Sequence, residues 1–277
     1  PIVLVQNEHR WFCADPDQAD AYLNELHRYL REGGVSVPIV SSNNLYATGE
    51  GETEGWNGHE DLLATFRQLR GVRPDQACLA LDFELGRARV WGQGEIAPSP
   101  GEALHELAQA LGAGAQINLA PFAGGSRFGF TGGRLPFSRD AYVAQSNDQG
   151  SPIAEDGSAS ATLDAIRPLL LFASTFERTL AGIEWGRGGT VAAPGGAGET
   201  IVHAPGENGS VVFVLRSPDA KTSRGLTREL LLPDGRTLEV DLKDSPAVWC
   251  VLDTAIGPNS RVDYTNASVI WSGARAL

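Results

Sequence analysis

The sequence lacks methionine altogether, has only three cysteines, and contains no apolar run close to the roughly 20 residues that a membrane span needs. Cys13, Cys78 and Cys250 are far apart and odd in number, so they predict neither a disulfide framework nor a CxxC metal site. Basic residues are few, with 22 Lys and Arg against 34 Asp and Glu, and the net charge is −12. This balance argues against nucleic acid and anionic membranes as partners, because both require clustered basic side chains.

The motifs of several enzyme classes are missing as well. GGSRFGFTGG, at residues 124–133, is rich in glycine but lacks both GxxxxGK[ST] and GxGxxG, so we reject nucleotide binding. The five histidines form no HxH or HExxH pattern, which argues against a metal site. No serine lies in a GxSxG elbow, which argues against a serine hydrolase.

Strands and helices alternate from Pro1 to about Phe172. We expect strands at 2–5, 35–40, 78–81 and 115–122, and helices at 17–31, 58–70, 100–112 and 160–172. Helices between such short strands imply right-handed crossovers and therefore a parallel sheet. Because the chain opens on an apolar strand without a start residue, we expect a fragment or a processed chain, with any targeting region upstream and the location open.

The composition changes near residue 182. Residues 182–198 are rich in Gly, Ala and Pro, and six short β-rich runs follow between residues 200 and 271. These runs predict a β-sandwich or barrel module. We therefore expect an α/β part at 1–181, a linker at 182–198 and a β-sandwich-like domain at 199–277.

Two acids follow the strand expected at residues 78–81. Asp82 and Glu84 are two residues apart, so a regular strand would point both carboxylates to the same side. An active-site cleft would explain the two charges, because active sites of parallel α/β folds lie at the carboxyl ends of strands. The alternative is that one of these acids merely pairs with Arg87 or Arg89.

A third acid follows the first strand, in the pair Asn7-Glu8. Carboxylates on different strands of one parallel sheet can face each other across a cleft, as a glycosidase requires: one is the general acid/base and the other is the nucleophile. Trp11, Trp56 and Trp91 follow strand ends and could stack on a sugar ring. For any single one of them, packing at the edge of the core is the better explanation.

Several segments, taken in order, resemble the second half of the family 35 glycoside hydrolases, the β-galactosidase family: VQNEHRW, VPIVSSNN, LALDFELGRARVWGQ, GAGAQINLAPFAGGSRFGFTGG and SPIAEDG. The resemblance covers Pro1 to about Phe172, and the β-rich tail is similar to the β domain that follows the barrel in that family. It implies a (β/α)8 TIM-type barrel of which this chain holds about strands four to eight. The upstream half of the barrel would be needed for a complete fold.

Carried over residue by residue, the resemblance gives Glu8 the acid/base role, provided that a two-residue gap keeps the Asn-Glu pair together. Asp82 falls where the family has its nucleophilic Glu. Because an Asp is one methylene shorter, Glu84 is the alternative nucleophile.

The resemblance also implies residues that bind the substrate. Asn7, Trp91 and Asn118 stand at matching positions, whereas Asn43 replaces a sugar-binding Asp of the family. Ala120 replaces a Tyr, so several groups that would recognise the sugar are altered.

These implications together predict a retaining exo-β-glycosidase that hydrolyses terminal β-galactosides by double displacement, with a carbohydrate as partner and without a metal or cofactor. Two alternatives stay open. The chain could be a non-catalytic carbohydrate-binding homologue that has lost the nucleophile, or a β-glycosidase of changed sugar specificity.

Overall fold

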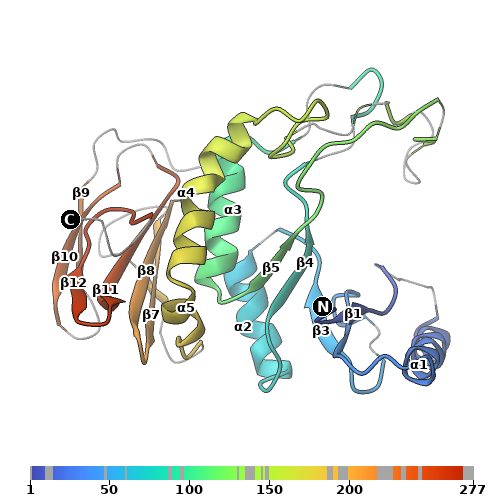
Figure 1. Cartoon of the computed structure of the whole chain (residues 1–277), viewed down its shortest axis with the longest axis horizontal. Coiled ribbons are helices and arrows are strands. Elements are labelled where there is room, and N and C mark those ends of the chain that lie inside the picture. The colour runs from blue at the N-terminus through green and yellow to red at the C-terminus, as the bar shows by residue number, and fades with distance from the viewer. Residues whose placement is uncertain are drawn as a thin grey trace. The chain divides into compact units, whose positions relative to one another are not determined.

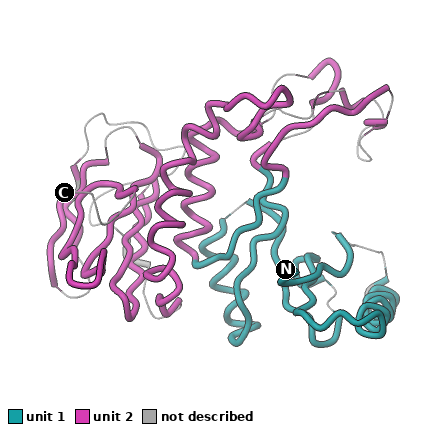
Figure 2. The backbone as a smooth tube through the Cα atoms, in the orientation of Figure 1, with its two compact units in different colours: residues 1–84, 114–120 teal, residues 85–113, 121–277 magenta. Residues whose placement is uncertain are grey.

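The computed structural model describes most of the chain, namely residues 2–9, 15–46, 49–59, 61–86, 89–93, 97–129, 131–134, 141–144, 146, 150–185, 190–192, 199–216, 227–231, 235–242 and 245–270. The chain forms two compact units, which Figure 2 distinguishes by colour. The first comprises Pro1–Glu84 and Gly114–Ala120, and the second comprises Leu85–Ala113 and Pro121–Leu277.

The first unit is built on a parallel sheet of five strands in sequential order (Figure 1). They are β1 (Val5–Gln6), β2 (Ile39–Ser41), β3 (Thr53–Trp56), β4 (Leu79–Phe83) and β5 (Gln116–Leu119). Because the strands are parallel and neighbours in sequence, all five carboxyl ends lie at one edge of the sheet. This confirms the predicted parallel sheet and fits part of a (β/α)8 barrel.

Two helices connect strands within this unit. Helix α1 (Pro16–Glu32) confirms the helix expected at 17–31, and it begins at Asp15, whose side chain accepts hydrogen bonds from the backbone nitrogens of Asp17 and Gln18. Helix α2 (Leu62–Val72) begins four residues later than expected, and it buries Leu62, Phe66 and Leu69.

Strand β3 was not predicted, because its sequence, TEGW, carries Glu54 and Gly55, and both residue types are depleted in strands. The structure gives a reason for Gly55. A Cβ there would lie 2.4 Å from Cδ1 of Leu81 and 2.9 Å from the carbonyl oxygen of Ser41, so the neighbouring strands need glycine at this point.

The second unit contains an antiparallel sheet of five strands and a two-stranded hairpin, as the β-rich tail predicts. The sheet order is β12-β11-β8-β7-β6, and β9 pairs with β10. The bounds are β6 (Thr190–Ala192), β7 (Glu199–Gly206), β8 (Gly209–Arg216), β9 (Thr227–Leu231), β10 (Thr237–Asp241), β11 (Ala247–Gly257) and β12 (Ser260–Tyr264).

Two details of this β part differ from expectation. Strand β6 lies inside the stretch expected to be a linker, and β12 was not predicted. Residues 268–270, expected to begin a final strand, are not in a strand, and Trp271 lies outside the described residues. The proposed domain boundaries otherwise stay a prediction.

Three helices also belong to the second unit: α3 (Pro100–Gly112), α4 (Ala161–Thr175) and α5 (Glu177–Ala181). Helices α3 and α4 lie side by side (Figure 1). Phe172 of α4 packs with its ring centroid 6.4 Å from that of Phe213 on β8 and 6.0 Å from that of Trp249 on β11. Helix α4 therefore shares an aromatic core with the β part of the same unit. Within the described segments, no helix has both the length and the apolar character that crossing a membrane would require.

Candidate active site

Residues in left-handed backbone cluster at the carboxyl edge of the parallel sheet. Glu8 has a φ of 61° after β1, Asn44 and Leu45 have φ of 52° and 63° after β2, and Asp82 has a φ of 49° in β4. Residues with a Cβ adopt this conformation rarely, at a cost of about 1–3 kcal/mol each. Because such strain gathers at functional sites, this edge is the candidate active site.

Asp82 interrupts the regularity of β4. The register between β4 and β5 shifts between Ala80 and Phe83, and Asp82 has its positive φ at that point. The strict alternation from which we expected Asp82 and Glu84 to share a side therefore does not extend through this strand end. Phe83 is buried, and Glu84 is partly buried.

The ends of β1 and β4 are joined by His9, a residue that the sequence analysis did not single out. Its Nδ1 lies 3.3 Å from Oδ2 of Asp82, and the two side chains are 62% and 15% exposed. The alternative, that Asp82 or Glu84 pairs with Arg87 or Arg89, stays a prediction, and Arg87 lies outside the described residues. The position of His9 directly after Glu8 was the only signal in the sequence.

The carboxylate of Glu8 is held by two donors. The hydroxyl of Tyr22, on α1, donates a hydrogen bond to Oε1 of Glu8, and the backbone nitrogen of His9 donates to Oε2 at 3.4 Å. The hydrogen bond to Glu8 is the main reason that the pKa of Tyr22 is raised above 10. Glu8 is thus a partly buried carboxylate oriented by a helix that follows it in the chain.

Asn7 is buried behind Glu8 and binds the protein itself. Its Nδ2 donates to the carbonyl oxygen of Leu23 at 3.0 Å and to Oε1 of Glu52 at 2.6 Å. The contact of Asn7 with the substrate stays a prediction, and the structure commits its amide nitrogen to α1 and to the residue before β3.

A second polar network joins the ends of β2 and β3. The side chain of Asn44 donates to the carbonyl oxygen of Asn57 and accepts from its backbone nitrogen, both at 2.7 Å. The buried carboxylate of Glu54 accepts from Oγ of Ser41 at 3.3 Å and from the backbone nitrogen of Leu45 at 3.0 Å. Asn43, the predicted sugar-binding residue at this strand end, is completely buried.

The last two predicted binding residues are open to solvent. Asn118 is exposed on β5 of the first unit. Trp91 belongs to the second unit, where it is 68% exposed and its backbone nitrogen donates to the carbonyl oxygen of Tyr142 at 2.9 Å.

Tyr142 and Trp91 share one face of a short antiparallel pairing. Val90 pairs with Val143, so the next residues, Trp91 and Tyr142, are directly opposite each other. Tyr142 is 56% exposed, whereas Val90 is buried on the other face. Of the other tryptophans, Trp56 is partly buried at the end of β3, and Trp11 lies outside the described residues.

In the described part of the chain, no group of three or more His, Cys, Asp and Glu residues could hold a metal ion. The side chains gathered at the carboxyl edge are carboxylates, amides, an imidazole and a phenol. Such groups can transfer protons and form a covalent ester, which is the chemistry of a two-carboxylate hydrolase.

Comparisons with known proteins bear on this site. The chain is 25% identical over 164 residues to β-galactosidase-1-like protein 3 of Homo sapiens, a match that covers 57% of this chain and 24% of that protein. It is 28% identical over 177 residues to β-galactosidase-1-like protein 2 of Homo sapiens, covering 60% and 27%. The chain is a distant relative of the β-galactosidase-1-like proteins. This confirms the resemblance to the family 35 glycoside hydrolases.

The relationship covers only part of these proteins. The chain spans about a quarter of the length of the curated relatives it matches. No family model matches it. Among solved structures, the cyclic α-maltosyl-(1→6)-maltose hydrolase from Arthrobacter globiformis is 13% identical, with a TM-score of 0.41 over 83% of this chain and 59% of that chain, a likeness too slight to assign a fold.

Proposed function

We propose that this chain carries the catalytic carboxylates of a retaining exo-β-glycosidase that hydrolyses terminal β-galactosides. The main support is the strained carboxyl edge of the sheet, where an acid follows β1, another lies in β4, and His9 links the two strand ends. The distant relationship to β-galactosidase-1-like proteins supports the sugar class.

In the proposed reaction, Glu8 donates a proton to the glycosidic oxygen while a carboxylate oxygen of Asp82 attacks the anomeric carbon. The bond to the leaving group breaks as the ester to Asp82 forms. Glu8 then takes a proton from water, whose oxygen displaces the ester and releases the sugar with retained configuration. If the shorter Asp82 does not reach the anomeric carbon, Glu84 is the nucleophile instead.

Substrate contacts are proposed for the exposed residues. In the first unit, Asn118 offers an amide on β5. In the second unit, taken by itself, the rings of Trp91 and Tyr142 offer an apolar surface on which a pyranose can stack. The buried Asn7 and Asn43 support the sugar site indirectly, by fixing the strand ends that carry it.

A complete barrel requires further strands. Strands β1 and β5 are the outer strands of the parallel sheet, so each has one edge without a strand partner in the segments that the structure describes. We propose that the other half of a (β/α)8 barrel covers these edges, because open edges of a hydrophobic sheet favour aggregation.

The test is covalent trapping of the full-length protein with a 2-fluoro-β-galactoside carrying an activated leaving group. We expect mass spectrometry to locate one sugar adduct on Asp82 or Glu84, and we expect Asp82→Asn or Glu84→Gln to abolish it. The variant Glu8→Gln should hydrolyse galactosides with unactivated leaving groups about 10²–10⁴-fold more slowly, because it cannot protonate the leaving oxygen.

A second candidate function, sugar binding without hydrolysis, is favoured by the short side chain of Asp82 at the position of the nucleophile. The two candidates give opposite results in the same experiment. A binder changes its fluorescence with galactose but acquires no adduct, and that outcome would remove the hydrolase from consideration.

A further inference from the structure

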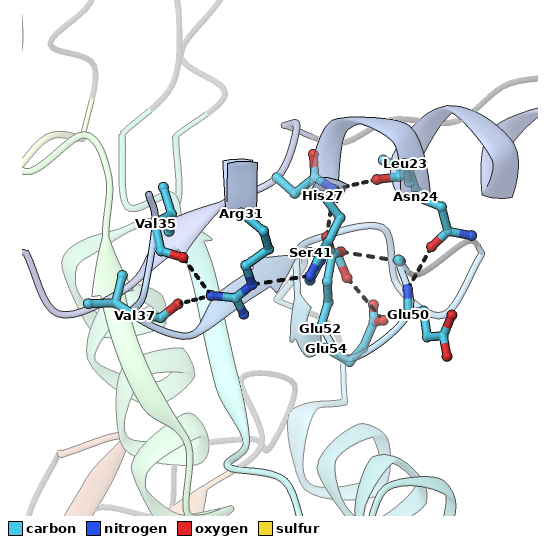
Figure 3. A network of polar contacts seen from close by, with 12 residues as sticks. Leu23, Asn24, His27, Arg31, Val35, Val37, Ser41, Glu50, Glu52 and Glu54 are labelled. Carbon is cyan, nitrogen blue, oxygen red and sulfur yellow. Dashed lines mark hydrogen bonds and ion pairs between the residues drawn. The ribbon is translucent and has the colours of Figure 1, made fainter. Parts of the chain in front are cut away.

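Glu52 is a buried carboxylate that the proposed reaction does not use. It directly precedes β3, and its side chain is 0% exposed. Three nitrogens surround it: Nδ2 of Asn7 lies 2.6 Å and Nδ1 of His27 3.0 Å from Oε1, and the backbone nitrogen of Gly49 donates to Oε2 at 3.2 Å. Figure 3 shows this network, in which His27 comes from α1.

The hydrogen bonds of His27 show which of its ring nitrogens is the donor. Nε of Arg31 lies 3.3 Å from Nε2 of His27, and the guanidinium also donates to the carbonyl oxygens of Val35 and Val37 at 3.0 and 2.9 Å (Figure 3). Since an arginine can only donate, Nε2 of His27 is an acceptor and its hydrogen sits on Nδ1. His27 therefore donates to Glu52, and all three partners of this carboxylate are donors.

The carboxylate of Glu52 fits closely against the backbone of Gly49. A Cβ on Gly49 would lie 2.6 Å from both Cδ and Oε1 of Glu52, so the carboxyl group packs directly on the glycine backbone. A buried charge is unfavourable unless it is fully hydrogen-bonded. We therefore infer that the surrounding residues are arranged to bind the carboxylate of Glu52.

Two sets of contacts connect Glu52 with Glu8. Asn7, which Glu52 holds, immediately precedes Glu8 and also donates to the carbonyl oxygen of Leu23 on α1. Helix α1, which Glu52 holds through His27, carries the Tyr22 hydroxyl that donates to Glu8.

We propose that Glu52 is a positioning residue that sets the orientation of the Glu8 carboxylate, by fixing both the backbone before it and the helix that donates to it. The catalytic consequence of this role rests on the proposed function of Glu8. The positioning itself does not, since it concerns contacts within the folded chain.

The test is Glu52→Gln in the full chain. Glutamine has the same shape but offers only one acceptor oxygen. Its NH₂ group must therefore face a donor, and the hydrogen bonds around residue 52 are disrupted. The readout is the phenol titration of Tyr22, isolated as the ultraviolet difference between each protein and the same protein carrying Tyr22→Phe. Because the hydrogen bond to Glu8 is the main cause of the raised pKa of Tyr22, we expect Glu52→Gln to return it toward 10.

The matched control is Glu54→Gln. Glu54 is equally buried and lies two residues away, but its carboxylate accepts from Ser41 and Leu45 at the end of β2. We expect this variant to lose stability and to leave the Tyr22 titration unchanged. If Glu52→Gln leaves that titration unchanged, or if both variants shift it equally, the proposal is overturned. If Glu52→Gln does not fold, His27→Gln is titrated in its place with the same expectation.

Turnover gives the second readout. We expect Glu52→Gln to lower kcat for an aryl β-galactoside by about 10- to 100-fold with a smaller change in KM, because misplacing a catalytic group by an ångström has effects of that size. If Glu8→Gln retains full turnover, the function proposed for Glu8 fails, and the Tyr22 titration still decides the role of Glu52.

Discussion

His9 and Asp82 are brought together from strands that are not neighbours: Nδ1 of His9, just after β1, lies 3.3 Å from Oδ2 of Asp82 in β4. The imidazole is mostly exposed and the carboxylate is mostly buried. An imidazole this close to one carboxylate oxygen can influence how the other oxygen is oriented.

We therefore expect His9→Ala to slow covalent trapping of Asp82 by roughly tenfold, because the polar contact of the imidazole with Oδ2 of Asp82 is lost. The variant His9→Gln should retain more of the rate, since its amide can still donate to the carboxylate. The measurement is the rate of adduct formation with the fluorinated galactoside. Equal rates for the wild type and His9→Ala would exclude a role for His9 in orienting the nucleophile.

The next prediction concerns the stacking of a sugar on Trp91 and Tyr142. We expect Trp91→Ala and Tyr142→Ala each to raise the Kd for galactose, measured by titration, by roughly 3- to 10-fold, because each loses one aromatic contact with the sugar. Tyr264→Ala is the matched control, since Tyr264 is a similarly exposed aromatic on β12 of the same unit. A Kd that rises as much in the control as in the other two variants would contradict sugar stacking.

The N-terminus of α3 gives a pH-dependent prediction. Oγ of Ser99 accepts from the backbone nitrogen of Glu102, whose carboxylate accepts from the backbone nitrogen of Ser99 at 2.7 Å. The side chain of Ser99 is the main cause, and its backbone nitrogen the second, of a pKa of Glu102 that lies below 4.5. A lowered pKa means that the stabilisation is complete above pH 4.5 and is lost as pH falls through the lowered value.

We accordingly expect Ser99→Ala to reduce the free energy of unfolding by about 1 kcal/mol at pH 7, and by less as the pH falls below 4.5. Urea unfolding at a series of pH values measures this difference. Ser160→Ala is the control, because Ser160 caps α4 through the backbone nitrogen of Leu163, where no carboxylate closes the box. A loss for Ser99→Ala that stays constant down to pH 3 would contradict the capping-box account.

Cysteine reactivity provides a further prediction. Burial raises the pKa of the Cys250 thiol to about 12, and it also raises that of Cys78. Both thiols are therefore protonated and covered at pH 8. A Cys13→Ser variant should show no labelling by a disulfide reagent when native and two labelled thiols in urea. Rapid labelling of the native variant would mean that one of these cysteines is accessible.

The sequence predicted the helices better than the strands. Helix α1 follows from an apolar stripe and the cap at Asp15, both of which are local signals. Strand β3 carries a buried glutamate and a glycine, and Gln76 and residues at the end of β2 form hydrogen bonds with that glutamate. Such partners are distant in sequence, so no local pattern indicates them.

The candidate site, too, could be predicted from the sequence only in part. The acids Glu8 and Asp82 could be found because they end apolar strands, but their left-handed backbone and the contact with His9 arise from packing between strands. The roles of Asn7 and Asn43 were inferred from position alone. Their burial depends on residues from other elements, such as Leu23 and Glu52 for Asn7, that the sequence does not place beside them.

The packing of Phe172 has an evolutionary consequence. This helix residue finds its aromatic neighbours, Phe213 and Trp249, on strands much further along the chain. The β part of the second unit is therefore not an appendage that recombination could exchange freely. A chain without those strands would expose the apolar face of α4 to water.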